Sequence, residues 1–325
     1  MSVPEPLVSV VVPTHNRWRL LERTLATVLA QRDVAFEVIV VDDGSRDDTP
    51  DLLSSIADAR LTVVREPVAR GVAAARNRGL EMARGRWIAF ADDDDLWAPD
   101  KLAAQVRAAE SHPEAGWVVV GEVTIDSSLT VTGARRPPRG REFREVLQYN
   151  IVPAGGSGTM ARTELVREVG GFNPQLTVLA DWDLWIRLFL AAPGVEVSRP
   201  LVAYLVHPTS MSHDSSAVMR ELDVLISAYG HARRQHGVRF LHLIWLQWLC
   251  RMELERGDRR RALRVALQAL GHLPELPSFL PLVVGGIRRR RPPRRWRREP
   301  DAWLSRLRRT TALPSAAGRC SGSPT

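Results

Sequence analysis

The first 110 residues alternate between short apolar runs and segments in which apolar residues recur at helical spacing. Continuous β-branched, apolar runs are typical of strands that are covered on both faces. We expect such strands at residues 7–13, 36–45, 60–66 and 86–91. Helical spacing predicts helices over 17–31 and 71–85, and a third after Pro99. This alternation predicts an α/β fold with a mostly parallel sheet flanked by helices.

Polar residues follow three of these strands at the point where each strand ends. The three groups are residues 13–15, the pair Asp42 and Asp43, and residues 92–95. In open α/β sheets, ligands bind outside the carboxyl ends of the strands. We therefore expect all three groups to converge on one crevice.

The four consecutive aspartates at 92–95 need a positive partner, because adjacent carboxylates repel one another. In an extended segment, Asp92 and Asp94 would point the same way, ~7 Å apart. Carboxylate oxygens suit Mg²⁺ or Mn²⁺, which bind substrate phosphates. The alternative is a solvated loop in which Asp95 or Asp100 caps the next helix. Their position after a buried strand favours the metal site.

Beyond residue 115 the pattern is mixed. It predicts a strand over 116–126, a helix over 180–192 and two or three helices within 215–273. We expect three parts: a main α/β domain at 1–212, a helical C-terminal extension at 213–285, and an Arg-rich tail without fixed structure at 286–325.

Charge and cysteine content narrow the setting. The net charge is +8, but residues 286–325 hold 12 arginines against two acidic residues, so the remaining body is close to neutral. That body gives no indication of nucleic-acid binding. Two cysteines cannot build a disulfide framework, which suits a cytoplasmic location. The N-terminal "MSVPEPLVSVVVP" is interpreted as a strand rather than a signal peptide, and no apolar run reaches the ~18 residues of a membrane span.

Four segments over roughly residues 7–210 resemble the family 2 glycosyltransferases. In chain order they are "VSVVVPTHNR", "VIVVDDGSRDDT", "GVAAARNRGLEMARGRWIAFADDDDLW" and "ADWDLWIRL". Members of this family are inverting, metal-dependent enzymes of the GT-A fold. The resemblance implies a GT-A catalytic domain, a nucleotide-diphosphate sugar as donor, and a divalent cation, Mn²⁺ or Mg²⁺, as cofactor. It also implies a glycan or lipid-linked acceptor in the synthesis of a cell-surface polysaccharide or glycoconjugate.

The resemblance assigns one set of residues to the nucleotide. Pro13 and His15 would frame the base, and Asp43 would accept a hydrogen bond from an N–H of the base, since a carboxylate can only accept. Arg76 and Asn77 would border the nucleotide. The alternatives are a local turn for Asp43 and a solvated helix surface for Arg76 and Asn77.

A second set would surround the donor diphosphate. Asp92, Asp93 and Asp94 match the family's Asp-x-Asp element. Asp94 would be the first metal ligand, with Asp92 and Asp93 on the donor side and Asp92 within reach of the metal. His207 would approach the metal or the diphosphate, and a purely structural histidine is its alternative.

Asp181, in "LADWDLWIRL", is the implied catalytic base. The family usually has Glu-Asp here, and this chain has Ala180 before Asp181. Asp181 would deprotonate the acceptor hydroxyl, which displaces the nucleoside diphosphate with inversion of the anomeric carbon. The alternative is a carboxylate that only stabilises a helix N-terminus.

Two other functions could use similar residues. A sugar nucleotidyltransferase should have a Gly-rich basic loop after the first strand, but "PTHNRWRL" contains no glycine. A non-catalytic sugar-nucleotide or glycan-binding protein would not need the full set of carboxylates. For the basic tail, a solvated segment competes with a contact to anionic lipid at the inner face of the membrane.

Overall fold

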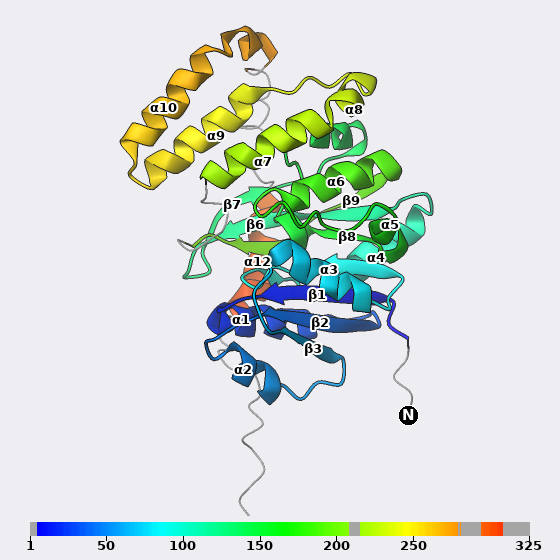
Figure 1. Cartoon of the computed structure of the whole chain (residues 1–325). Helices are drawn as coiled ribbons and strands as arrows, with labels where there is room; N and C mark the ends of the chain where they lie inside the picture. The colour runs from blue at the N-terminus through cyan, green and yellow to red at the C-terminus, as the bar shows by residue number, and fades with distance from the viewer. Residues whose placement is uncertain (1–4, 208–214, 279, 281–293, 308–325) are drawn as a thin grey trace, which may run out of the picture.

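The computed structural model describes residues 5–207, 215–278, 280 and 294–307 (Figure 1). Within them, nine strands form one sheet in the order β3-β2-β1-β4-β8-β6-β9-β5, and β7 pairs with β6. The strands are β1 (Val8–Thr14), β2 (Phe36–Asp43), β3 (Leu61–Glu66), β4 (Trp87–Phe90), β5 (Leu96–Trp97), β6 (Trp117–Ile125), β7 (Val131–Arg135), β8 (Thr159–Arg162) and β9 (Gly194–Leu205).

Helices cover both faces of this sheet. The α-helices are α1 (Trp18–Leu29), α2 (Thr49–Ser55), α3 (Val72–Met82), α4 (Lys101–Ser111), α5 (Thr163–Glu168), α6 (Ala180–Ala191), α7 (Ser215–Ala228), α8 (Gly230–Gln235), α9 (His242–Glu255), α10 (Arg259–Leu270) and α12 (Arg294–Leu307). The described residues also include the 3₁₀ helices η1 (Gly140–Leu147), η2 (Gly155–Gly158) and η4 (Leu273–Glu275).

The N-terminal half of the sheet is parallel, as the sequence predicts. β1 pairs in parallel with β2 and β4, and β2 pairs with β3. Successive residues of β1 serve opposite faces: Val10 packs with Leu25 of α1, and Val11 packs in the core that includes Leu80 of α3. Burial on both faces explains the continuous apolar runs of β1 and β2, whereas β3 lies at the edge of the sheet and is largely exposed.

The other half of the sheet is mixed, so the expectation of a mostly parallel sheet holds only for the first half. β8 runs antiparallel to both β4 and β6, β5 runs antiparallel to β9, and β6 pairs in parallel with β9. The Gly-rich segment before β8 is thereby brought beside the carboxyl end of β4, where the aspartates follow.

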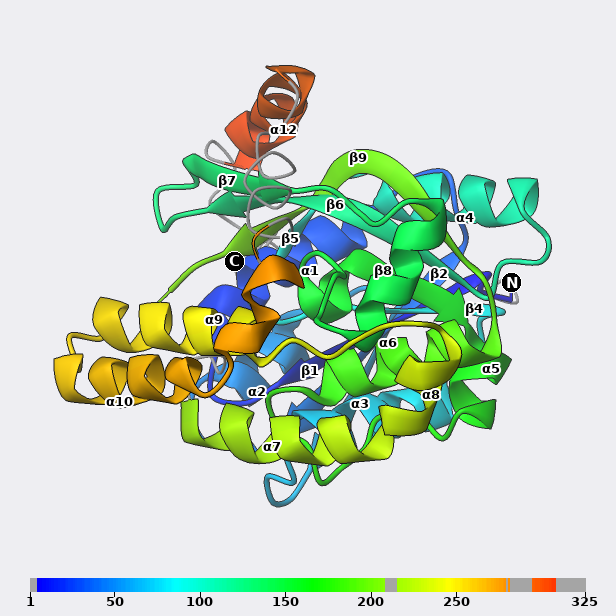
Figure 2. The ribbon, with the colours of Figure 1, turned by 90° about the horizontal axis from the view of Figure 1, so that it is seen from above.

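The C-terminal helices form a layer over α6 (Figures 1 and 2). Within residues 215–273 there are four α-helices, α7 to α10, rather than the two or three expected, because α8 is a separate short helix. Leu222 of α7 and Trp245 of α9 belong to the same buried core as Leu184 of α6, and the Trp245 and Trp182 rings lie 4.7 Å apart. The boundary near residue 212 stays a prediction, between parts that share a core.

Part of the segment expected to lack fixed structure is helical. Residues 294–307 form α12, which lies against β9 (Figure 2). Trp296 and Leu304 are buried beside Val123 of β6, and Glu299 accepts a 2.6 Å hydrogen bond from Arg199. The rest of the predicted tail lies outside the described residues. Within the described part of the chain, every helix is too short or too polar to cross a bilayer.

Candidate active site

A cleft of about 1110 Å³ opens at the carboxyl ends of β1, β2 and β4. All predicted site residues except Asn77 and His207 line it, and His207 contacts one of the lining aspartates. The lining residues from the predicted set are Pro13, His15, Asp43, Arg76, Asp92, Asp93, Asp94 and Asp181. The topology therefore joins three strand ends and the start of α6 in one crevice.

The four aspartates form a turn rather than an extended segment. The Asp95 N–H donates to the Asp92 carbonyl at 3.2 Å. The expected alternation of Asp92 and Asp94 along a strand therefore does not apply. Instead, each of the first three carboxylates contacts an arginine, which is Arg76 for Asp92 and Arg17 for both Asp93 and Asp94.

Two arginines and one histidine supply positive or proton-donating groups to this turn. Arg76 donates to Asp92 Oδ1. Arg17 donates at 3.1 Å to both Asp93 Oδ1 and Asp94 Oδ2, and His207 Nε2 lies 2.8 Å from Asp94 Oδ2. Sequence reasoning did not single out Arg17, although it closes the quoted segment "VSVVVPTHNR".

The donor set of the turn suits a hard divalent cation. Among the described residues, no hydrogen bond engages Asp92 Oδ2 or Asp94 Oδ1. Both carboxylates line the cleft. Free carboxylate oxygens are the ligands that Mn²⁺ and Mg²⁺ prefer, so these residues fit the predicted metal.

Burial makes these carboxylates harder to ionise. It raises the pKa of Asp93 to about 6, with a further contribution from Asp94 and opposition from Arg17 and Thr14. Burial also raises the pKa of Asp92, and the Arg76 charge opposes it. The two arginines therefore do not fully offset the burial of these carboxylates and the repulsion between them. A bound cation would favour their ionised forms.

Asp95 stands apart from its neighbours. It is fully buried, and among the described residues neither carboxylate oxygen has a well-formed hydrogen bond. Burial raises its pKa well above the usual range, and the nearby Ser157 side chain opposes the shift. Lys101 is equally buried, with Nζ 3.6 Å from the Trp97 ring centre. Asp95 therefore neither lines the cleft nor caps α4.

The nucleotide end of the cleft is built from the ends of β1 and β2. Asp42 makes the local turn by accepting from the Ser45 N–H at 2.9 Å. Asp43 instead accepts from the N–H groups of Arg70 and Gly71, at 2.8 and 2.7 Å. Its carboxylate retains lone pairs for a further donor. His15 is exposed, with Nδ1 2.6 Å from the Asp43 carbonyl.

The adjacent residues Arg76 and Asn77 have different surroundings. Arg76 is 5% exposed and lines the cleft, so it is not a solvated helix-surface residue. Asn77 lies outside the lining residues, because its side chain donates to the Phe172 carbonyl and accepts from the Phe172 N–H, both at 2.7 Å. Asn77 therefore does not border the cleft and instead positions the loop before α6.

Asp181 lies in the first turn of α6 and faces the cleft. Its carboxylate accepts from the Trp182 N–H at 2.7 Å and from Asn150 Nδ2 at 3.2 Å. Burial raises its pKa, and the Arg76 charge opposes that shift. Asp183 faces away and pairs with Arg187 and with the Tyr229 hydroxyl, 2.6 Å from its Oδ1.

Two glycines of η2 allow the carboxylates to converge. A Cβ on Gly155 would lie 3.0 Å from Asp181 Oδ2 and 3.8 Å from Asp92 Oδ2. A Cβ on Gly156 would lie 3.1 Å from Arg76 Nη2 and 3.2 Å from Asp92 Oδ1. The candidate base and the aspartate turn thus border the same short stretch of bare backbone.

The far wall of the cleft comes from segments that no motif indicated. Tyr149 and Asn150 follow η1, and Ile244, Trp245 and Trp248 come from α9. Wall residues on α9 lie more than 60 positions beyond Asp181 in the chain. Only the tertiary fold brings them to the site, although the aromatic content of "LIWLQW" was a visible signal.

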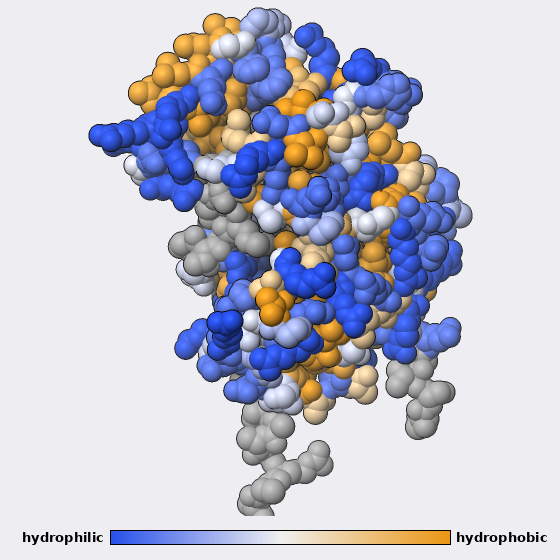
Figure 3. All heavy atoms as spheres, viewed as in Figure 1, coloured by the Kyte–Doolittle hydropathy of each residue, from blue (hydrophilic) through white to orange (hydrophobic). Residues whose placement is uncertain are grey.

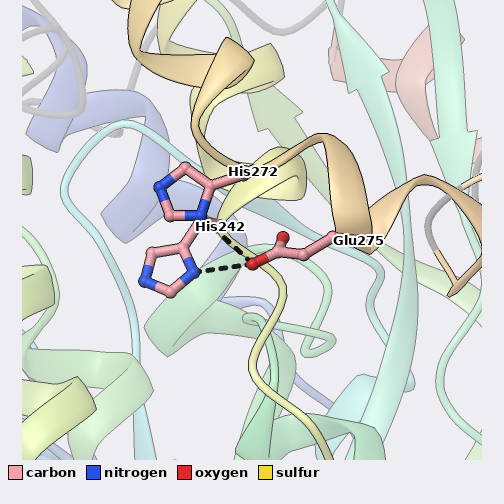
Figure 4. Close-up of side chains that lie close together, drawn as sticks. All are labelled: His242, His272 and Glu275. Carbon is pink, nitrogen blue, oxygen red and sulfur yellow. Dashed lines mark hydrogen bonds and ion pairs between the residues drawn. The ribbon is translucent and has the colours of Figure 1, made fainter.

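A second group of potential metal ligands lies at the start of α9 (Figure 4). The facing atoms of His242, His272 and Glu275 lie within 4.8 Å of one another. Glu275 accepts from the Leu243 N–H at 3.1 Å and lies 2.8 Å from His242 Nδ1. The carboxylate therefore already serves as a cap for the α9 N-terminus, and none of the three lines the cleft.

Comparison with known proteins places this geometry in a family. The family model described as Glycosyl transferase family 2 matches residues 9–170. A PGL/p-HBAD biosynthesis glycosyltransferase of Mycobacterium bovis is 30% identical over 187 residues, which cover 57% of this chain and 70% of that protein. The UDP-Glc:alpha-D-GlcNAc-diphosphoundecaprenol beta-1,3-glucosyltransferase WfaP of Escherichia coli is 27% identical over 227 residues, 68% of this chain and 86% of WfaP.

A solved structure supports the same fold. The mannosyltransferase PcManGT from Pyrobaculum calidifontis, in complex with GDP-Man and Mn²⁺, aligns with a TM-score of 0.54 at 24% identity. The alignment covers 93% of this chain and 86% of that one. The fold is thus that of the GT-A glycosyltransferases, as the sequence predicts.

Proposed function

The chain belongs to glycosyltransferase family 2, and we propose that it is an inverting enzyme that moves a sugar from a nucleotide-diphosphate donor to an acceptor hydroxyl. The observation that carries the proposal is the convergence of Asp181 and Asp92 on the bare backbone of Gly155. A base and a diphosphate site on either side of one small space suit a direct displacement.

The donor would occupy the strand-end side of the cleft. Pro13 and His15 would border the base, and Asp43 would use its remaining lone pairs to accept from a base N–H. Arg76, already beside Asp92, and Arg17, beside Asp93 and Asp94, would hold the diphosphate by charge. Relatives use different bases, since WfaP is named for UDP-Glc and PcManGT is bound to GDP-Man.

A divalent ion would be held by Asp94 and Asp92, with His207 close to Asp94. When bound, Mn²⁺ or Mg²⁺ would offset the charge that develops on the leaving diphosphate. Asp181 would take the proton of the acceptor hydroxyl at its free lone pairs, while Asn150 and the Trp182 N–H keep the carboxylate oriented.

The acceptor would enter along the wall formed by η1 and α9. WfaP is named for a diphosphoundecaprenol-linked acceptor, and we propose a lipid-linked or glycan acceptor for this chain. That substrate class suits a cytoplasmic protein that works at the inner face of the membrane, in polysaccharide or glycoconjugate synthesis.

A screen over nucleotide sugars with Mn²⁺ or Mg²⁺ tests the proposal. We expect release of nucleoside diphosphate from at least one donor, and loss of release after chelation or in Asp94→Asn. A nucleotidyltransferase would instead form pyrophosphate from a nucleoside triphosphate and a sugar phosphate. A non-catalytic binder would bind a donor without turning it over, and either result would overturn the proposal.

A further inference from the structure

Helix α10 presents leucines to solvent. Leu263, Leu267 and Leu270 are 61%, 55% and 59% exposed, and their spacing places them on one face of the helix. The side that packs on α9 is formed by smaller residues, with Ala262 buried and Val265 half-buried. A helix at a protein surface normally buries its large apolar side chains, so α10 has the reverse arrangement.

The exposed apolar side chains are concentrated in this region. Of the eleven large apolar residues that are exposed in the described part of the chain, six lie between residues 254 and 280. The other three, Leu254, Leu273 and Leu280, lie outside α10. Figure 3 shows hydrophobic surface over α10, next to a strongly hydrophilic cluster. Apolar patches of this kind mark contact surfaces.

Basic side chains accompany the leucines. Arg259, Arg260 and Arg264 are exposed on the same helix. Between residues 256 and 280, five arginines stand against only two acidic residues. One of these, Asp258, caps α10 by accepting from the Arg261 N–H at 2.9 Å. The other, Glu275 of η4, accepts from the Leu243 N–H at the start of α9. The partner of this surface should therefore be apolar and negatively charged.

We propose that the α10 surface, formed by Leu263, Leu267 and Leu270 with Arg259, Arg260 and Arg264, docks on a bilayer that contains anionic lipid. The leucines enter the boundary between headgroups and acyl chains, and the arginines remain at the level of the lipid phosphates. Both halves of the amphipathic surface then have a partner.

Docking in this way would set the cleft close to the membrane. α10 packs on α9, and α9 supplies Ile244, Trp245 and Trp248 to the cleft wall. A lipid-linked sugar could then reach the cleft without leaving the bilayer, and this consequence rests on the proposed function. The docking itself does not rest on the proposed function, because it depends only on the α10 surface.

Co-sedimentation with vesicles tests the surface. The untagged full-length chain is mixed with vesicles of phosphatidylcholine alone or with added phosphatidylglycerol. We expect binding that needs the anionic lipid and weakens with salt. Leu263→Ser with Leu267→Ser should bind at least about tenfold more weakly, and Arg260→Gln with Arg264→Gln should lose the preference for anionic vesicles.

Matched controls separate this surface from general effects. Leu190 and Val224 are 42% and 50% exposed on other helices, so Leu190→Ser with Val224→Ser should bind like the unchanged chain. Turnover of the donor in solution should be the same in all variants, which distinguishes a failure of docking from a failure of the proposed function.

Three results would overturn the proposal. One is no sedimentation with either vesicle, and another is equal sedimentation of the full-length chain and the double leucine variant. The third is a dimer in solution that the leucine variant abolishes without any vesicle binding, which would assign the α10 surface to a second copy of the chain.

Discussion

Asp181 has the orientation and the access to the cleft that a general base requires. It is held by the Trp182 N–H and Asn150, and it faces the cleft rather than a permanent cationic partner. The Asp183 carboxylate, two positions later, already accepts hydrogen bonds from Arg187 and from the Tyr229 hydroxyl. The difference between these two carboxylates lies in their surroundings, and those surroundings have measurable consequences.

The first consequence is a pH dependence of the rate. Burial raises the pKa of Asp181 above its ordinary value, and a base acts in its deprotonated form. The rate should therefore rise with pH as Asp181 loses its proton, and fall on acidification at a pH clearly above ~4, where an ordinary aspartate titrates. The pH profile of kcat/KM measures this, with donor binding followed over the same range. A rate that stays level down to about pH 4 would contradict the shift.

The second consequence concerns Gly156. A methyl group there would lie 3.1 Å from Arg76 Nη2 and 3.2 Å from Asp92 Oδ1. Gly156→Ala should push this pair apart and lower kcat/KM by about one to two orders of magnitude, with little change in melting temperature. Gly133→Ala is the control, because its nearest neighbour would be Thr124 Oγ1 at 3.4 Å. Equal activity of the two variants would show that the close approach is unimportant.

At the scale of elements, α7 positions the start of α6. Glu221 is 7% exposed and accepts from the N–H groups of Thr177, Val178 and Leu179, at 2.7 to 3.0 Å. Asp181 follows two residues after Leu179. A residue of α7 thus fixes the loop that leads into α6 and its candidate base.

Glu221→Gln should weaken this link, since the amide nitrogen cannot accept from a backbone N–H. We expect a loss of about 1–3 kcal/mol in the free energy of unfolding and a lower rate with nearly unchanged donor binding. Thermal unfolding and steady-state kinetics measure the two effects. Glu168→Gln, at an exposed position of α5, serves as the control. Unchanged stability and rate would remove the proposed link between α7 and the site.

Helix α12 lies in a segment whose amino-acid composition does not predict a helix. The Arg-rich sequence predicts a tail without fixed structure, yet Trp296 and Leu304 are buried beside β6 and β9. Trp296, Trp303 and Leu304 recur at intervals of seven and eight residues, which is helical spacing. The high density of arginine obscured this pattern.

For the whole molecule, the hydrophobic and polar pattern of the sequence predicts the side of the cleft formed by the strand ends. It does not predict the opposite wall, which α9 supplies. Buried strands and the polar residues after them indicate the crevice that holds Asp43, Asp92 and Asp94, because parallel strands end at one edge. The turn at the aspartates and the role of Asn77 depend on local hydrogen bonds that periodicity does not encode. The α9 wall depends on packing between segments that are distant in the chain, so the sequence could not place it.

The proposed reaction requires Asp181 to deprotonate the acceptor in a metal-assisted sugar transfer. The most direct measurement is the rate of transfer by Asp181→Asn from the donor found by the screen, with Asp51→Asn, exposed on α2, as the control. We predict that Asp181→Asn binds the donor normally but transfers sugar about 10²–10⁴-fold more slowly, while Asp51→Asn is unaffected. Transfer by Asp181→Asn at the unchanged rate would contradict the account.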